Sequence, residues 1–379
     1  MRTRPIRFDW LLPTLAGVSV ALTLLTGSRG DAGVGVGEIG LAVCILIGLL
    51  RSLGRPVRME RRFLAMPHVL LIYGIFIMLP LTVVHFYAET PGSSMRDWLA
   101  YMLSFLFVFS LHQSKADLSL AGKFFLLALT GILVYQYFNG GISSWYSSRF
   151  TAGAKNPNQL ALYCICGGVV AAASFKKKWV TGIFVGILFL FGLQSRSDAF
   201  AAMALAVGFG FVVAYVVPRR LLVPLGLPLL LGGAALSVMY IGPLLDLVDV
   251  EWSGADEGGG RMTLYKNGLL AWLSSIHSFL IGNGAGSFSG LLGPFGKSEA
   301  HNTPIDMLTI GGVLGLVFYI FPLKFMLDAY RERRLLLFSF IIGMVVFSLF
   351  HFVARQPVWW FALLCAAFFL RRHSINGAI

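Results

Sequence analysis

The chain has 379 residues, of which 57% are hydrophobic and only 12% are charged, and its mean hydropathy is +0.78. This composition excludes an ordinary soluble globular protein and indicates a polytopic membrane protein. The net charge of +13 does not indicate a nucleic-acid site, because the basic residues are distributed over the connections between apolar segments.

Twelve apolar segments follow one another along the chain, and they predict an all-α fold of about twelve transmembrane helices. They occupy residues 10–26, 34–50, 67–87, 96–112, 121–138, 158–175, 178–194, 198–217, 221–241, 304–323, 335–353 and 357–370. We expect residues 1–379 to form a single integral membrane domain. The first segment has a basic flank like a signal peptide but no convincing cleavage site, and we interpret it as an uncleaved helix.

The distribution of charge predicts the orientation in the membrane. If the N-terminus is cytoplasmic and the helices alternate, 21 of the 30 Lys and Arg residues fall on the cytoplasmic side. Both termini are then cytoplasmic, and the long connection over residues 242–303 faces the opposite side. The four cysteines all lie within predicted helices, where they are most simply small packing residues: Cys44, Cys164, Cys166 and Cys365.

Two polar positions stand out before the long connection. The sequence NPNQ predicts that Asn156 caps a helix with Pro157 at its first position, and Asn156 also offers a polar group to a nearby site. Arg196 lies in a short polar turn between two apolar segments. It either reaches the lipid headgroups, with Asp198 in the first turn of the next helix, or holds a specific anion.

The connection over residues 242–303 is long enough to suggest a functional role. Its sequence RMTLYKNGLLAWLSSI predicts a helix on the membrane surface that Arg261 opens, with Tyr265 and Trp272 at headgroup level. The connection carries six acidic and three basic residues, Lys266 among the latter, so an anion would need specific contacts there. Arginine offers these, since its planar fork of donors matches phosphate oxygens.

Two weaker patterns in this connection have simpler explanations. Gly282, Gly284 and Gly286 form G-x-G-x-G, but no strand precedes them, which argues against a dinucleotide site. The acidic residues over 249–251 offer ligands to a divalent ion, although a solvated acidic loop explains them equally well.

The sequence AHNTPID closes the long connection. Thr303 is the expected N-cap of the next helix, Pro304 fits its first position, and His301 and Asn302 lie just outside the helix. The positive end of a helix disfavours a charged imidazole. His301 is therefore a candidate base for a hydroxyl group, or else, with Asn302, simply completes the loop.

These features together resemble the O-antigen ligase and polymerase superfamily of bacterial membrane glycosyltransferases. The resemblance covers most of the chain. It rests on the twelve segments, the SRS turn, the arginine-headed helix in the long outer loop, and the sequences GNGAGSFS and AHNTPIDMLTIGGVLG. Each motif is short, and their order and shared side of the membrane make the set specific.

The resemblance implies a glycan donor on undecaprenyl pyrophosphate and a site at the periplasmic face of the bacterial inner membrane. It implies no cofactor and no metal. It assigns Arg196 and Arg261 to the pyrophosphate and His301 to the acceptor hydroxyl. Asn302, Lys266 and Asn156 are the further candidate substrate-binding residues.

The acceptor is left open by the sequence. It is lipid A–core for a ligase, another lipid-linked glycan for a polymerase, or else a protein. A secondary transporter or a lipid-linked sugar flippase is the competing class. Such proteins place charges near the bilayer midplane, whereas the charges here gather at the ends of the apolar segments.

Overall fold

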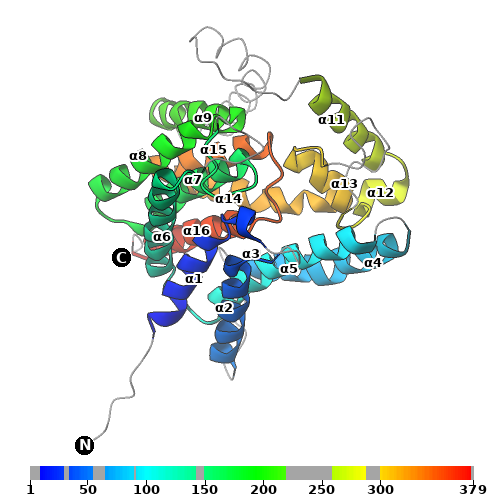
Figure 1. Ribbon diagram of the computed structural model, residues 1–379, viewed down its shortest axis with the longest axis horizontal. Coiled ribbons are helices and arrows are strands. Elements are labelled where there is room, and N and C mark those ends of the chain that lie inside the picture. The colour runs from blue at the N-terminus through cyan, green and yellow to red at the C-terminus, as the bar shows by residue number, and fades with distance from the viewer. Residues whose placement is uncertain are drawn as a thin grey trace, which may run out of the picture.

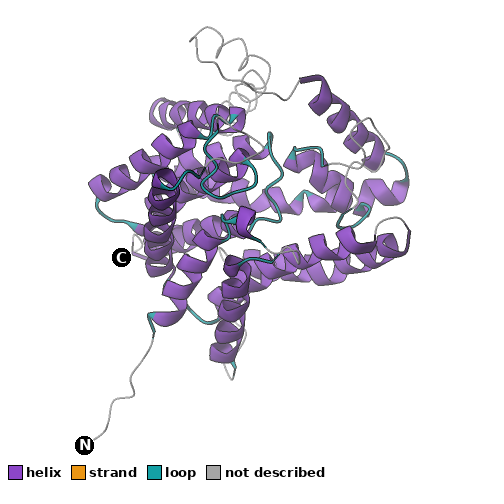
Figure 2. Cartoon of the chain, viewed as in Figure 1, coloured by secondary structure: helices purple, strands orange, loops and turns teal. Residues whose placement is uncertain are grey.

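The computed structural model is a bundle of helices, which Figure 1 shows in chain order. It describes residues 9–29, 34–53, 65–88, 91–141, 149–218, 258–286 and 299–376. Within these ranges the chain is helical and contains no strand (Figure 2), so the expectation of an all-α fold is confirmed.

The helices follow the apolar segments closely in position. They are α1 (Leu11–Leu22), α2 (Val36–Ser52), α3 (Ala65–Tyr73), α4 (Leu79–Ala88), α5 (Pro91–Gln113), α6 (Leu118–Phe138), α7 (Pro157–Ser174), α8 (Lys178–Gln194), α9 (Asp198–Val216), α11 (Gly258–Trp272), α12 (Ile276–Ile281), α13 (Thr303–Gly315), α14 (Val317–Arg331), α15 (Leu335–Ser348) and α16 (Pro357–Asn376). The 3₁₀ turn η1 (Thr26–Ser28) follows α1, and the π turn η2 (Gly74–Met78) joins α3 to α4.

The number of helices suited to cross a membrane is smaller than expected. In the described part of the chain, three are long and apolar enough: Met66–Val83, Leu118–Phe138 and Asp198–Val216. A fourth results if α13 and α14, which meet at 93°, count as one broken span. The expectation of twelve full-length spans is therefore wrong by this measure, and the segment at 221–241 lies outside the described residues.

In two of the apolar segments, a local feature of the chain explains why the helix is too short to cross a membrane. The apolar segment at 10–26 forms a helix of only 12 residues before the chain turns into η1. The segment at 304–323 is interrupted at Gly312, whose φ of 57° and ψ of −153° are not helical. Apolar composition predicts burial or lipid contact, but it does not reveal where a helix breaks.

The centre of the bundle is α7, which is buried along almost its whole length. Gly168 permits close packing, since a Cβ there would lie only 2.5 Å from the Phe340 ring of α15. The cysteines Cys164 and Cys166 of this helix are buried and free, which agrees with a packing role.

The helices α7 and α9 both pack antiparallel to α15. A Cβ at Gly343 would contact Val207 and Ile165, whereas Gly210 faces Ile342 and Gly168 faces Phe340. Residue numbers therefore rise along α7 and α9 as they fall along α15. Consequently the beginnings of α7 and α9 lie at the same end of the bundle as the last turn of α15.

We call this end the Arg196 end, and it comprises residues 23–29, 149–156, 195–197, 299–302 and 349–356. Backbone hydrogen bonds join its connections, from Gly27 N to Gly153 O at 2.9 Å and from Phe150 N to Gln194 O at 3.2 Å. The opposite Lys177 end comprises residues 114–117, 175–177, 217–218 and 332–334. There Ser119 Oγ donates to Ser174 O at 3.1 Å, and the Tyr330 hydroxyl donates to Val217 O.

Candidate functional site

The Arg196 turn joins α8 to α9 by a tight reversal. Arg196 has a φ of 47° and an exposed side chain, whereas Ser195 and Ser197 on either side are buried. Arg149 holds the turn from outside, donating to Ser195 O at 3.1 Å and also to Arg196 O. The turn thus presents one cation on a backbone that is hydrogen-bonded in place.

The beginning of α7 lies against this turn. Ser197 Oγ donates to Asn158 Oδ1 at 2.6 Å, and Asn156 Oδ1 accepts from Asn158 N at 2.8 Å. Asn156 is therefore the N-cap of α7, as predicted, and its side-chain oxygen is engaged by the helix. Asp198 lies in the first turn of α9, also as predicted, while Ser197 caps that helix.

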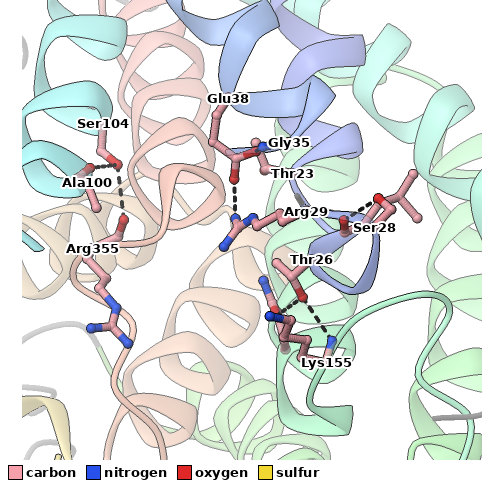
Figure 3. A network of polar contacts seen from close by, with 12 residues as sticks. Thr23, Thr26, Ser28, Arg29, Gly35, Glu38, Ala100, Ser104, Lys155 and Arg355 are labelled. Atoms are coloured by element: carbon pink, nitrogen blue, oxygen red, sulfur yellow. Dashed lines mark hydrogen bonds and ion pairs between the residues drawn. The ribbon is translucent and has the colours of Figure 1, made fainter. Parts of the chain in front are cut away.

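The same end of the bundle contains the connection between α1 and α2. Figure 3 shows Thr26 accepting from the backbone nitrogen of Lys155, at 2.9 Å, and Arg29 paired with Glu38 at the beginning of α2. This arginine is neutralised by a carboxylate. Arg196 has no ion-pair partner among the described residues.

His301 lies on a short loop before α13 and has a φ of 53°, which is uncommon for a residue with a Cβ. The carboxylate of Asp306 accepts from both flanking amides, Ala300 N at 2.9 Å and Asn302 N at 3.3 Å. Asn302 caps the helix by accepting from Ile305 N at 3.2 Å. The expectation that Thr303 is the cap is therefore wrong, although α13 does begin at Thr303.

Thr303 instead bonds to the α15–α16 connection. Its hydroxyl donates to His351 O at 2.6 Å and accepts from Val353 N at 3.0 Å. Asn302 adds a bond from its amide nitrogen to Leu349 O at 2.9 Å. A hydroxyl can donate and accept at once, and here both capacities join two loops that are far apart in the sequence.

The imidazole of His301 lies parallel to that of His351. Their ring centroids are 5.9 Å apart and the ring planes differ by 7°. His351 is buried, whereas His301 is partly exposed. Solvent or a ligand can therefore reach His301 from outside while the buried ring lies behind it.

Arg355, in the α15–α16 connection, is a charged residue that the sequence reasoning missed. Its guanidinium contacts Asp97 of α5 at 3.2 Å and also Glu299, two residues before His301. Burial alone would lower the pKa of Arg355, but the two carboxylates outweigh it and raise the pKa above its ordinary value. The guanidinium is therefore charged at any ordinary pH, and the bridge persists only where the carboxylates of Asp97 and Glu299 are ionised as well.

The helix α11 brings the remaining candidates to α13. It begins at Gly258, three residues before the expected start at Arg261. The helix contacts α13 at Gly268, whose carbonyl accepts from Thr309 Oγ1 at 3.1 Å. Tyr265 donates to Leu349 O at 3.4 Å, while Lys266 is exposed. The side chain of Arg261 lies outside the described residues.

The glycine pattern over 282–286 serves packing, in agreement with the argument against a dinucleotide site. The break at Gly312 frees carbonyls of α13, and Thr309 O and Ile310 O accept instead from Asn283 N at 3.0 Å and Gly284 N at 2.9 Å. A Cβ at Gly284 would lie 2.7 Å from the backbone of Leu81 in α4. Only glycines allow the chain to pass between these helices with the observed positive φ angles.

The structure thus brings Arg196, Asn156, His301 and Asn302 to one end of the bundle, with α11 beside the His301 loop. The described residues contain no group of three or more His, Cys, Asp or Glu side chains suited to hold a metal ion. The acidic segment at 249–251 lies outside the described residues.

The fold therefore defines an α-helical protein with three or four candidate membrane spans and a polar cluster at one end. No known family model matches the chain, and no curated protein sequence matches it. The assignment of an activity consequently depends on the chemistry of the Arg196 end.

Proposed function

We propose that the protein is a membrane glycosyltransferase that moves a glycan from undecaprenyl pyrophosphate to a hydroxyl acceptor, in the manner of an O-antigen ligase. The proposal rests on one observation. Arg196, whose side chain is exposed, and His301, whose loop is held by hydrogen bonds, occur at the same end of the helical bundle. A diphosphate needs a cation, and a hydroxyl nucleophile needs a base.

The chemistry requires few groups, because the donor is already activated. The acceptor hydroxyl attacks the anomeric carbon of the donor sugar, and the bond between that carbon and the pyrophosphate oxygen breaks. The hydroxyl proton passes to the His301 imidazole, and prenyl pyrophosphate leaves with the negative charge. Arg196 and Arg261 stabilise that charge. In this scheme the stabilisation of the leaving group contributes more to the rate than the proton transfer to His301 does.

The remaining candidates have supporting roles in the proposal. Lys266 is exposed on α11 and adds positive charge near the leaving group. Asn302 and Asn156 cap α13 and α7, so they act chiefly by fixing the positions of His301 and of the Arg196 turn. The proposed orientation in the membrane places the Arg196 end in the periplasm.

The charge of the two ends supports this orientation. The Lys177 end and its adjoining helix ends contain a dense set of basic residues: Lys115, Lys123, Lys176, Lys177, Lys178, Arg331, Arg333, Arg334, Arg371 and Arg372. Single cysteines introduced at Lys155 and Lys177 test the orientation. The four native cysteines are buried and therefore do not compete for a thiol reagent. In cells with a permeabilised outer membrane, an impermeant thiol reagent should label only Lys155→Cys. Labelling of only Lys177→Cys would reverse the orientation.

The activity itself is tested with purified protein in proteoliposomes that contain a lipid-linked glycan and an acceptor. Transfer to lipid A–core supports a ligase, and growth of the lipid-linked glycan supports a polymerase. Movement of the glycan across the bilayer without transfer supports a flippase and contradicts the proposal. In cells, loss of a ligase should leave bare lipopolysaccharide core, while loss of a polymerase should leave core with a single repeat.

A further inference from the structure

We propose that Arg355 is a positioning residue that holds the His301 loop in its reactive conformation. Arg355 does not need to touch the substrate for this role. Its guanidinium joins Asp97 on α5 to Glu299, and Glu299 lies two residues before His301. The catalytic consequence rests on the proposed function, whereas the conformational consequence can be measured without any substrate.

Arg355 is itself fixed to α5 by both its main chain and its side chain. The single hydroxyl proton of Ser104 is shared between Ala100 O at 3.0 Å and Arg355 O at 3.2 Å, the two contacts that Figure 3 shows. The guanidinium contacts Asp97 at 3.2 Å, about two turns earlier on the same helix. The bridge therefore connects the His301 loop to a long helix and not to another loop.

The burial of the bridge separates it from ordinary surface ion pairs. The side chain of Asp97 is only 6% exposed and that of Glu299 is 15% exposed. A partly buried carboxylate that loses its cationic partner becomes unfavourable, so removal of Arg355 should displace Glu299 toward solvent. Displacement of Glu299 moves the chain immediately before His301.

The loop is held independently from its other side. Asp306 accepts from the amides of Ala300 and Asn302, the two neighbours of His301. A positive φ at a residue with a Cβ persists only where the surroundings hold it, and His301 has a φ of 53°. Arg355 and Asp306 together supply that restraint, the former from the α15–α16 connection through its contact with α5 and the latter from α13.

Lysine should not replace arginine well at this position. The two carboxylates are engaged by different nitrogens of one guanidinium, Nη1 for Asp97 and Nη2 for Glu299. A lysine ammonium is a single point and cannot keep the same geometry with both. The matched control is Arg331 at the Lys177 end, whose guanidinium lies 3.9 Å from Asp328 on an exposed helix end.

The test is hydrogen–deuterium exchange of the purified protein without substrate, followed in the peptide that contains residues 299–306. Arg355→Gln and Glu299→Gln should each raise exchange of the Ala300 and Asn302 amides about tenfold, while α7 stays protected. Arg331→Gln should change neither region. Unchanged exchange of the loop in a folded Arg355→Gln or Glu299→Gln protein would overturn the proposal, and Glu299→Gln retains the test if Arg355→Gln fails to fold.

A second measurement follows the catalytic consequence. In the transfer assay, Arg355→Gln should lower kcat about 10- to 100-fold with little change in the donor KM, because His301 is misplaced while the donor site is intact. Arg355→Lys should regain only part of kcat. A raised donor KM at normal kcat would overturn the positioning role. Absence of transfer in the wild type would instead contradict the proposed function and leave the exchange result standing.

Discussion

Two arginines at the same end of the bundle have opposite surroundings. Arg196 is exposed, lies on a turn with a positive φ and has no ion-pair partner among the described residues, whereas Arg355 is engaged by two carboxylates and fixed to α5. A cation of the first kind is available to an external anion. A cation of the second kind is already neutralised and can only hold other parts of the chain in place.

The comparison separates binding from positioning within one candidate site. The Arg196 turn is fastened through its backbone, so its side chain is left for a ligand. The His301 loop is fastened through side chains on α5, α13 and the α15–α16 connection, so its backbone is held in an uncommon conformation. Substitutions in the two regions should therefore fail in different ways.

The largest effect is expected at His301. His301→Ala should fold, bind the lipid-linked donor and lower the transfer rate by about 10² to 10⁴, because a hydroxyl loses its base. His301→Gln should be nearly as slow, since an amide cannot accept the proton. The wild-type rate should fall in acid as the imidazole becomes protonated. His277→Ala, on the exposed part of α12, is the control and should leave the transfer rate unchanged. If His301→Gln instead transfers at the wild-type rate with an unchanged pH profile, His301 only orients the acceptor.

The next effect is expected at the arginines proposed to hold the pyrophosphate. Arg196→Lys and Arg261→Lys should each reduce transfer about 10- to 100-fold and weaken donor binding, because lysine keeps the charge but not the planar fork. Arg333→Lys is a matched control, since Arg333 is also exposed on a turn with a φ of 52° but lies at the Lys177 end. Normal activity in both variants would contradict pyrophosphate binding and favour the interpretation that Arg196 contacts the lipid headgroups. A chelator should leave the wild-type activity unchanged.

A smaller effect, on stability, is expected from Thr303→Val. The hydroxyl of Thr303 is buried and joins α13 to the α15–α16 connection through His351 O and Val353 N. Its removal leaves two buried backbone groups without that partner, which should lower the stability by about 1–3 kcal/mol. Thermal unfolding in detergent measures the change, and Thr303→Ser should retain most of the stability. Equal melting of Thr303→Val and wild type would contradict the proposed strength of this link.

The smallest effect is expected from Asn156→Ala. Its side chain caps α7 through one hydrogen bond, and loss of an N-cap costs about 1 kcal/mol. Donor binding should stay normal, because the amide oxygen is already used by the helix. A selective loss of donor affinity with unchanged melting would instead show that Asn156 contacts the substrate, and Asn156→Asp, which also caps, distinguishes the two outcomes.

The local features of the chain were predictable from short stretches of sequence. Apolar composition indicated helices throughout, NPNQ indicated the start of α7, and the position of Asp198 indicated the first turn of α9. Each depends on interactions within a few residues, such as a cap bonding to the next turn. Where two neighbours compete for the same role, sequence is less decisive, and Asn302 rather than Thr303 caps α13.

Only the tertiary structure decided which distant residues meet. Asp97 and Arg355 are 258 positions apart, and no local pattern indicates that they form a pair or that Arg355 acts on the His301 loop. The break at Gly312 likewise depends on Asn283 and Gly284, whose amides satisfy the carbonyls that the interrupted helix frees. The sequence determined a helical, membrane-compatible chain because periodicity and capping are local, whereas the partners at the Arg196 end depend on how those helices pack.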